Sequence, residues 1–196
     1  MRERALFEIE FSNEQLDQIG EAVDHIDRGV PRVLQGAISR TLRHAQTLVI
    51  RKLATAASIG QRSLRKNISI HKPRFDDLVG WIRFGAGRVP IIEMQARQTQ
   101  EGVTFRGREG RQLILHAFIQ NIQGRRGVLR RAGKTPRSED LVPRAPLLFL
   151  KGPSFWRLWE THPQVQSEVA AELQGELEKQ TEQRLRWVLQ RYGGKA

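Results

Sequence analysis

The spacing of hydrophobic and polar residues changes twice along the chain, and each change predicts a change of secondary structure. Residues 7–11, Phe-Glu-Ile-Glu-Phe, alternate with period two, which predicts a short strand with one buried face. A helix follows, because Ser12 and Gln15 form a capping-box pattern and Phe11 and Leu16 are placed to close over the first turn as a hydrophobic staple. The apolar face of this helix continues at helical spacing through Ile19, Val23 and Ile26.

A second, longer helix is predicted from Pro31 to about Ala57. Pro31 cannot donate a backbone amide, so it separates this helix from the first one. Ser58 is a candidate cap for a third, short helix that reaches about Lys66. The long helix has an apolar stripe that comprises Leu34, Ile38, Leu42, Ala45, Leu48 and Leu53. Residues 1–66 are therefore predicted to be mainly helical.

Between residues 67 and 131 the hydrophobic period changes to two, which predicts strands. The turns between these runs are rich in Gly, Pro, Arg and Asp, so we expect an antiparallel sheet with basic loops. Pro90 places its strand at an edge of the sheet or at a strand start. The predicted strands are residues 67–72, 78–84, 89–94, 102–106, 113–119 and 127–130.

The remainder is predicted to be an arm and a long C-terminal helix. Residues 132–160 begin with a polar stretch interrupted by prolines, which predicts a loop or arm. Residues 161–191 are predicted to be helical, with glutamates early and arginines late, an order that complements the helix dipole. Its apolar positions repeat every fourth residue at Val165, Val169, Leu173 and Leu177. The whole chain, residues 1–196, is predicted to be one α+β domain.

Charge adds a strong constraint on partners. The chain has a net charge of +12, and residues 88–137 contain eleven Lys or Arg against three Glu. Such a surface suits nucleic acid phosphates or acidic faces of neighbouring subunits, although it could also be a solvated surface. No helix-turn-helix, zinc finger or RNP-type strand accompanies the cluster, so base-specific DNA reading is not expected. The candidate contact residues are Arg106, Arg108, Arg111, Arg125, Arg126, Arg130, Arg131 and Lys134.

Hydrophobic residues make up 39% of the chain, so we expect a modest core that neighbouring subunits help to complete. Phe155, Trp156 and Trp159 gather just before the final helix, as packing residues beneath it or as interface anchors. The absence of cysteine excludes disulfides and Cys-based zinc sites. No apolar run reaches the roughly 20 residues that span a bilayer, and no signal-peptide pattern begins the chain. We therefore expect a soluble protein made in the cytoplasm, with no membrane association.

Candidate chemistry is sparse. The five histidines are scattered singly, without metal-ligand spacing, and His116 lies in an apolar run that predicts a partly buried strand residue. Asp76 and Asp77 follow a proline and are expected to form a turn. The glycines at 85–87 and 107–110 lack the rest of a phosphate-binding loop, and no serine lies in a nucleophile elbow. We expect neither catalysis nor a bound cofactor or metal.

Six short segments occur in an order that resembles one family. They are 30–41 (Val-Pro-Arg-Val-Leu-Gln-Gly-Ala-Ile-Ser-Arg-Thr), 59–66 (Ile-Gly-Gln-Arg-Ser-Leu-Arg-Lys), 96–99 (Ala-Arg-Gln-Thr) with Gly102-Val103, 117–120 (Ala-Phe-Ile-Gln) with Gly124, 128–134 (Val-Leu-Arg-Arg-Ala-Gly-Lys) and 150–154 (Leu-Lys-Gly-Pro-Ser). Together they resemble the minor tail protein Z family of tailed phages, also called tail completion proteins, over about residues 20–191. Residues 135–146 depart from the resemblance, because relatives have a shorter link there, so no role is carried onto them.

The resemblance implies a structural virion protein rather than an enzyme. Such a protein is made in the host cytoplasm and joins the head-proximal end of the tail late in assembly. It enables head–tail joining and is associated with placement of the DNA end and with DNA ejection. The implied partners are tail terminator or tail tube proteins, head–tail connector proteins and copies of the same chain in a ring, expected to be a hexamer, with non-specific contact to packaged DNA. The alternative is a general non-specific nucleic-acid-binding protein, and a small hydrolase or toxin is a remote third.

Overall fold

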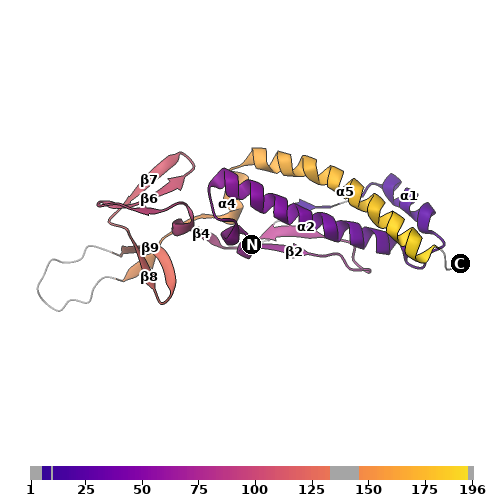
Figure 1. The fold of residues 1–196 in the computed structure, drawn as a ribbon, viewed down its shortest axis with the longest axis horizontal. Coiled ribbons are helices and arrows are strands. Elements are labelled where there is room, and N and C mark those ends of the chain that lie inside the picture. Colours follow the sequence, from indigo (N-terminus) through magenta and orange to yellow (C-terminus); the bar gives the residue numbers. More distant parts are fainter. Residues whose placement is uncertain (1–5, 10, 133–145, 194–196) are drawn as a thin grey trace, which may run out of the picture.

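Two long helices lie side by side along one half of an elongated molecule, and β-hairpins form the other end (Figure 1). The helices are α2 (Gly29–Ala57) and α5 (Pro163–Tyr192). The structure is a computed structural model that describes residues 6–9, 11–132 and 146–193. It has the predicted α+β class, with N-terminal helices, antiparallel strands and a long C-terminal helix.

The N-terminal capping box is confirmed. In α1 (Asn13–Val23) the Ser12 hydroxyl accepts a hydrogen bond from the Gln15 backbone amide at 3.2 Å, and the Gln15 side chain accepts one from the Ser12 amide at 3.1 Å. The strand before it, β1 (Phe7–Glu8), is shorter than predicted. The helix ends at Val23, before Ile26, and Arg28, at φ 52°, then turns the chain into α2.

Helix α2 follows the predicted pattern, and all six residues of its predicted apolar stripe are buried. It begins at Gly29, so Pro31 lies in the first turn, where the missing amide costs no intrahelical bond. The prediction for Ser58 was wrong. At φ 53° it donates its amide to the carbonyls that end α2, whereas Gly60 precedes α3 (Gln61–Asn67). Ser58 therefore caps the earlier helix.

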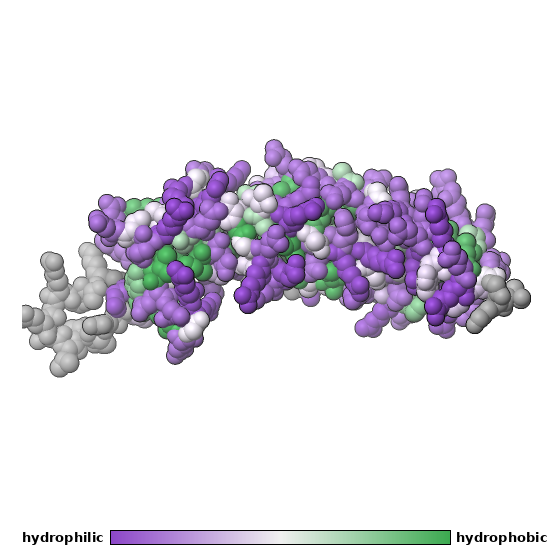
Figure 2. Space-filling model, viewed as in Figure 1, coloured by the Kyte–Doolittle hydropathy of each residue, from purple (hydrophilic) through white to green (hydrophobic). Residues whose placement is uncertain are grey.

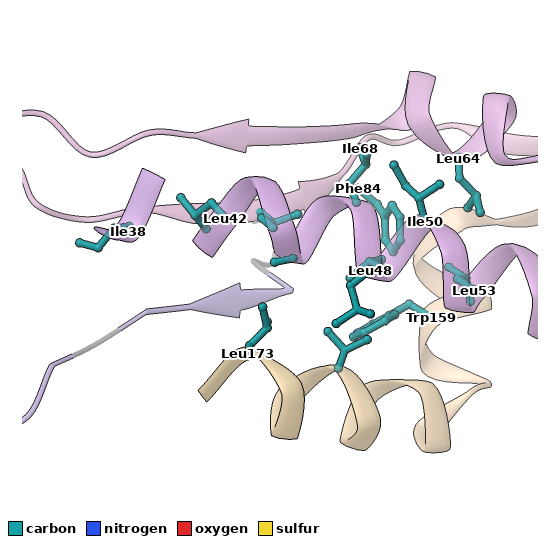
Figure 3. Close-up of a cluster of buried hydrophobic side chains, with 14 of the residues drawn as sticks. Ile38, Leu42, Leu48, Ile50, Leu53, Leu64, Ile68, Phe84, Trp159 and Leu173 are labelled. Carbon is teal, nitrogen blue, oxygen red and sulfur yellow. The ribbon is translucent and has the colours of Figure 1, made fainter. Parts of the chain in front are cut away.

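The main core lies between α2, α5 and a three-stranded sheet of order β1-β3-β2. Here β2 (Ile68–His71) and β3 (Trp81–Phe84) pair antiparallel. Figure 3 shows side chains from the helices and the sheet converging, among them Leu53, Phe84, Trp159 and Leu173. This core positions α4 (Phe155–Glu160), which leads into α5.

The strands beyond residue 85 do not join the first sheet, so the single predicted sheet is corrected to four small antiparallel ones among the described residues. A small second hydrophobic cluster, comprising Ile91, Val103, Ala117 and Val128, lies among the strands beyond residue 85. Predicted strand 89–94 becomes β4 followed by the 3-10 turn Ile91–Glu93. The remaining strands are β4 (Arg88–Pro90) with β11 (Lys151–Ser154), then β5 (Arg97–Gln98), β6 (Gly102–Gly107) and β7 (Gly110–Leu115), and then β8 (Phe118–Ile122), β9 (Arg125–Arg131) and β10 (Leu147–Phe149).

The predicted strand 113–119 is in fact the end of β7 and the start of β8. His116 has φ 58°, a left-handed conformation that breaks the run and lets the two halves pair with different strands. The histidine is exposed, so its expected place as a partly buried strand residue was wrong. Hydropathy could not reveal the break, since both halves are apolar.

Part of the predicted arm is regular structure. Residues 146–160 contain β10, β11 and α4, and the Ser154 hydroxyl accepts a hydrogen bond from the Arg157 amide to cap α4. These strands pair with β9 and β4, partners distant in sequence, which a local pattern does not display. Helix α5 begins at Pro163 and ends before Gly193, close to its predicted limits.

Candidate interaction surfaces

The described residues hold no group of three or more His, Asp or Glu that could bind a metal ion. No helix in these parts of the chain is long and apolar enough to cross a membrane. The Asp77 carboxylate accepts a hydrogen bond from the Val79 amide at 3.2 Å, which gives it a role in a turn. The arginine and aromatic candidates lie on several surfaces and in the core, and Figure 2 shows hydrophilic residues over most of one face, with a hydrophobic area among the hairpins.

The β8–β9 hairpin presents the first arginine pair. Its turn residues Gln123 and Gly124 both have positive φ, at 51° and 77°, the conformation of a type I′ turn. Arg125 and Arg126 follow immediately and are exposed. The guanidinium of Arg125 lies 4.9 Å from the ring centroid of Phe149, a cation–π contact that orients it. Strand pairing thus holds the base of the hairpin while its tip carries two cations.

The second pair, Arg130 and Arg131, lies at the other end of β9. Arg126 and Arg130 are four positions apart along the strand, about 13 Å at the usual rise per residue. The four arginines therefore form two pairs rather than one cluster, and the expected mutual repulsion is weaker than their sequence spacing suggests. Lys134, the remaining candidate of this segment, lies outside the described residues.

A shallow groove of about 500 Å³ runs between β5 and β8. Arg97 and Arg126 line it, with Ala96 and Ile119 as apolar contacts. The Gln98 side chain fixes one wall of the groove through two hydrogen bonds. Its oxygen accepts from the Ile119 amide at 2.8 Å, and its nitrogen donates to the Gly102 carbonyl at 3.0 Å. The groove is open and has cations on two sides, so it suits an anionic group rather than an enclosed small molecule.

The β6–β7 hairpin carries the third arginine group. Arg106 and Arg111 are directly opposite each other across the strand pair, and Arg108 lies in the turn between them. All three are exposed, and the only side-chain hydrogen bond found for them in the described residues joins Arg111 Nη1 to Thr104 Oγ1 at 3.0 Å. No carboxylate neutralises this group within the described chain.

The three aromatic candidates in α4 differ in how deeply they are buried. Phe155 is fully buried and Trp159 is 4% exposed, and both rings contact Phe84, with centroids 6.2 and 6.3 Å away. Trp159 also meets Phe7 edge to face at 5.4 Å. Trp156 is only partly buried, and its indole nitrogen donates to Glu160 at 2.6 Å. The first two residues belong to the core between sheet and helices, whereas Trp156 reaches the surface.

Sequence analysis missed an arginine–aromatic cluster between α2 and α5. Arg184 donates to the Arg32 carbonyl at 3.3 Å and lies 3.8 Å from the Trp187 ring centroid. Burial, and then the charge of Arg40, lower the pKa of Arg184. Gly36 provides the space, because a side chain there would overlap Arg184. Arg32 and Arg184 are 152 residues apart in sequence, so no local motif could signal the contact between them.

Sequence analysis also missed an acidic face on α1. Glu14, Asp17, Glu21 and Asp24 are all exposed and recur at intervals of three or four residues, which places them on one side of the helix. None of them forms an ion pair within the described ranges. By contrast, residues 85–132 and 146–154 contain ten Lys or Arg against three Glu. The charge is therefore unevenly distributed, and the periodicity of the acidic residues could have revealed this.

Comparison with known proteins gives one match. A family model described as prophage minor tail protein Z (GPZ) matches residues 15–191. Neither the curated proteins nor the solved structures provide a match. The matched range takes in every described helix and strand except β1, the first two residues of α1 and the last residue of α5.

Proposed function

The chain belongs to the prophage minor tail protein Z family, and from this membership we propose that it completes the head-proximal end of a phage tail and makes the tail competent to join the head. Membership itself makes it a structural component of the phage tail. The match over residues 15–191 is the observation that carries the proposal, because it spans both the helical half and the basic hairpins. We propose no catalytic step.

In this proposal the protein acts as a ring, with six copies as the expected number. Two features support a subunit that neighbours complete. The second hydrophobic cluster has only four buried members in the described residues, and three large side chains of the hairpin region, Leu113, Leu115 and Leu148, are more than two-fifths exposed. Exposed apolar groups of this kind are stabilised when a neighbour covers them. The ring would contact tail terminator or tube proteins on one side and connector proteins on the other.

The basic hairpins would then face anions in the assembled particle. Arg125 and Arg126 at the β8–β9 tip, with Arg130 and Arg131 at its base, would meet either the phosphates of the packaged DNA end or acidic side chains of adjacent subunits. Both partners provide the counter-charge that the described chain lacks around Arg125, Arg126 and Arg130. Phosphate contact would place the DNA end without reading its sequence.

Removing the protein from its phage tests the proposal. We expect lysates without it to contain free heads and tails of normal length, which fail to join, and we expect the intact gene supplied in trans to restore joining. Electron microscopy and plaque counts measure both. Tails that lack the protein yet join heads and give normal plaque numbers would refute the function.

A second candidate, non-specific nucleic-acid binding, is favoured by the ten basic and three acidic residues of the hairpin region. Each phosphate contact releases counterions, so such binding must weaken steeply as salt rises. Purified protein that binds bulk duplex DNA with a steep salt dependence would support this candidate. Absence of binding at low salt would leave the tail function as the single proposal.

A further inference from the structure

The outer face of the β5–β6–β7 sheet is an unpartnered surface. Alternate residues of β6 point inward to the second hydrophobic cluster, as buried Val103 does, so the others point outward. Directly paired residues share a face. The register therefore gathers six outward residues on one side of this sheet: Arg97, Thr104, Arg106, Arg111, Leu113 and Leu115.

This face is poorly suited to full exposure to solvent. Leu113 and Leu115 are 43% and 55% exposed, and they follow Arg111 along β7 at alternate positions. Arg106 and Arg111 are paired across the strands, where like charges destabilise each other. A partner with carboxylates would neutralise the arginines, and its aliphatic carbons would cover the leucines. The face thus fits an acidic protein surface.

Helix α1 of the same chain has the complementary chemistry. Its row comprises Glu14, Asp17 and Glu21 and continues to Asp24, the residue that follows the helix. The row spans about ten helical rises, about 15 Å, and has no cation paired with it in the described residues. Along β7, Arg111 to Leu115 spans about 13 Å. Gly20 lies beside this row, and a side chain there would meet nothing within 4 Å, so the helix can be approached closely. The two surfaces match in length and oppose in charge.

The two surfaces lie at opposite ends of the molecule. Figure 1 places α1 beside the C-terminal part of α5, whereas β6 and β7 lie at the far end of the β-rich half. They cannot meet within one chain, but they can meet between two copies. A contact between different faces of identical subunits is heterologous, and it generates a ring when the rotation closes.

We propose that the outer face of the β5–β6–β7 sheet of one subunit docks on the acidic face of α1 of the next. This inference rests on the ring of the proposed function and assigns its subunit contact. The partner is a second copy of this chain. Each subunit provides one basic and one acidic surface, so the chain of contacts is directional and continues around the ring.

A charge exchange tests the contact. Arg106→Glu with Arg111→Glu should reduce head joining about tenfold or more, and so should Asp17→Lys with Glu21→Lys, because each places like charges together. All four substitutions in one chain should restore joining to within a few-fold of the natural protein. Arg43→Glu with Arg51→Glu makes the same charge change on exposed positions of α2 and should leave joining unaltered. A fourfold variant as defective as the two double variants would overturn the proposal.

Cross-linking in assembled tails gives a second, direct measurement. The chain contains no cysteine, so Leu113→Cys and Gly20→Cys introduce the only thiols. A short thiol cross-linker should join a mixture of these two variants, but neither variant alone, and should give a ladder of oligomers with the double variant. No cross-link in the mixture, in tails that require the protein for joining, would refute the contact while leaving the proposed function intact. Tails that join without the protein would instead refute the function.

Discussion

Replacing Trp159 by alanine should destabilise the protein far more than replacing its neighbour Trp156. Trp159 is 4% exposed and lies among Phe7, Phe84 and the helices, so its removal leaves a cavity that the surrounding core cannot fill. Truncation of a buried Trp to Ala costs about 3–5 kcal/mol. That is a large share of a typical total stability of about 5–15 kcal/mol.

The expected melting shifts follow from chain length. For a domain of this size each kcal/mol corresponds to about 2–4 °C, so Trp159→Ala should lower Tm by about 6–20 °C. Trp156→Ala loses a partly exposed side chain and the indole hydrogen bond to Glu160. Such a bond contributes about 0.5–1.5 kcal/mol, which corresponds to a shift of about 1–6 °C.

Thermal unfolding followed by circular dichroism at a helix wavelength measures these shifts, because α2 and α5 dominate the signal. Trp159→Phe is the matched control, since it keeps an aromatic ring near Phe7 and should fall between the natural protein and Trp159→Ala. Equal shifts for the two alanine variants would contradict the burial argument. An unchanged Tm for both, together with failed assembly, would identify the tryptophans as interface anchors.

Three further substitutions test local structure and function. Ser12→Ala removes one half of the capping box and should cost about 1 kcal/mol, measured by chemical denaturation. Gly36→Val forces Arg184 from its place between α2 and α5, which should cost about 1–3 kcal/mol by the same measurement; an unchanged stability would show that Arg184 relocates freely. Arg125→Glu with Arg126→Glu should preserve folding but abolish head joining, measured by plaque counts, and full infectivity would show that the hairpin tip is merely solvated.

Hydrophobic period and local capping chemistry made most of the helical half predictable. The stripe of α2, the capping box at Ser12 and the start of α5 near Pro163 are encoded within a few residues of sequence. The order of short segments also indicated the family that the family model shows. The candidate arginines could be identified from the sequence, but their arrangement in space could not.

The β-rich half was less predictable because its pattern is interrupted by backbone conformation. His116 and Gln123 adopt positive φ without being glycine, and Ser58 does so at the end of α2. Such conformations are imposed by neighbouring strands or helices rather than by residue type. The hydropathy pattern therefore predicted one strand where β7 and β8 are two, and one sheet where the described residues form four small ones.

The sequence by itself determined the class of the fold, the amphipathic helices and the basic character of the chain, since each depends on residue type and local spacing. Only the tertiary structure decided which charges meet. It separated the arginines of β9 into two pairs, placed Arg184 against the Arg32 carbonyl of α2, and set an acidic helix and a basic sheet face at opposite ends. These arrangements depend on contacts between residues far apart in the chain, whose energies arise only when packing brings them together.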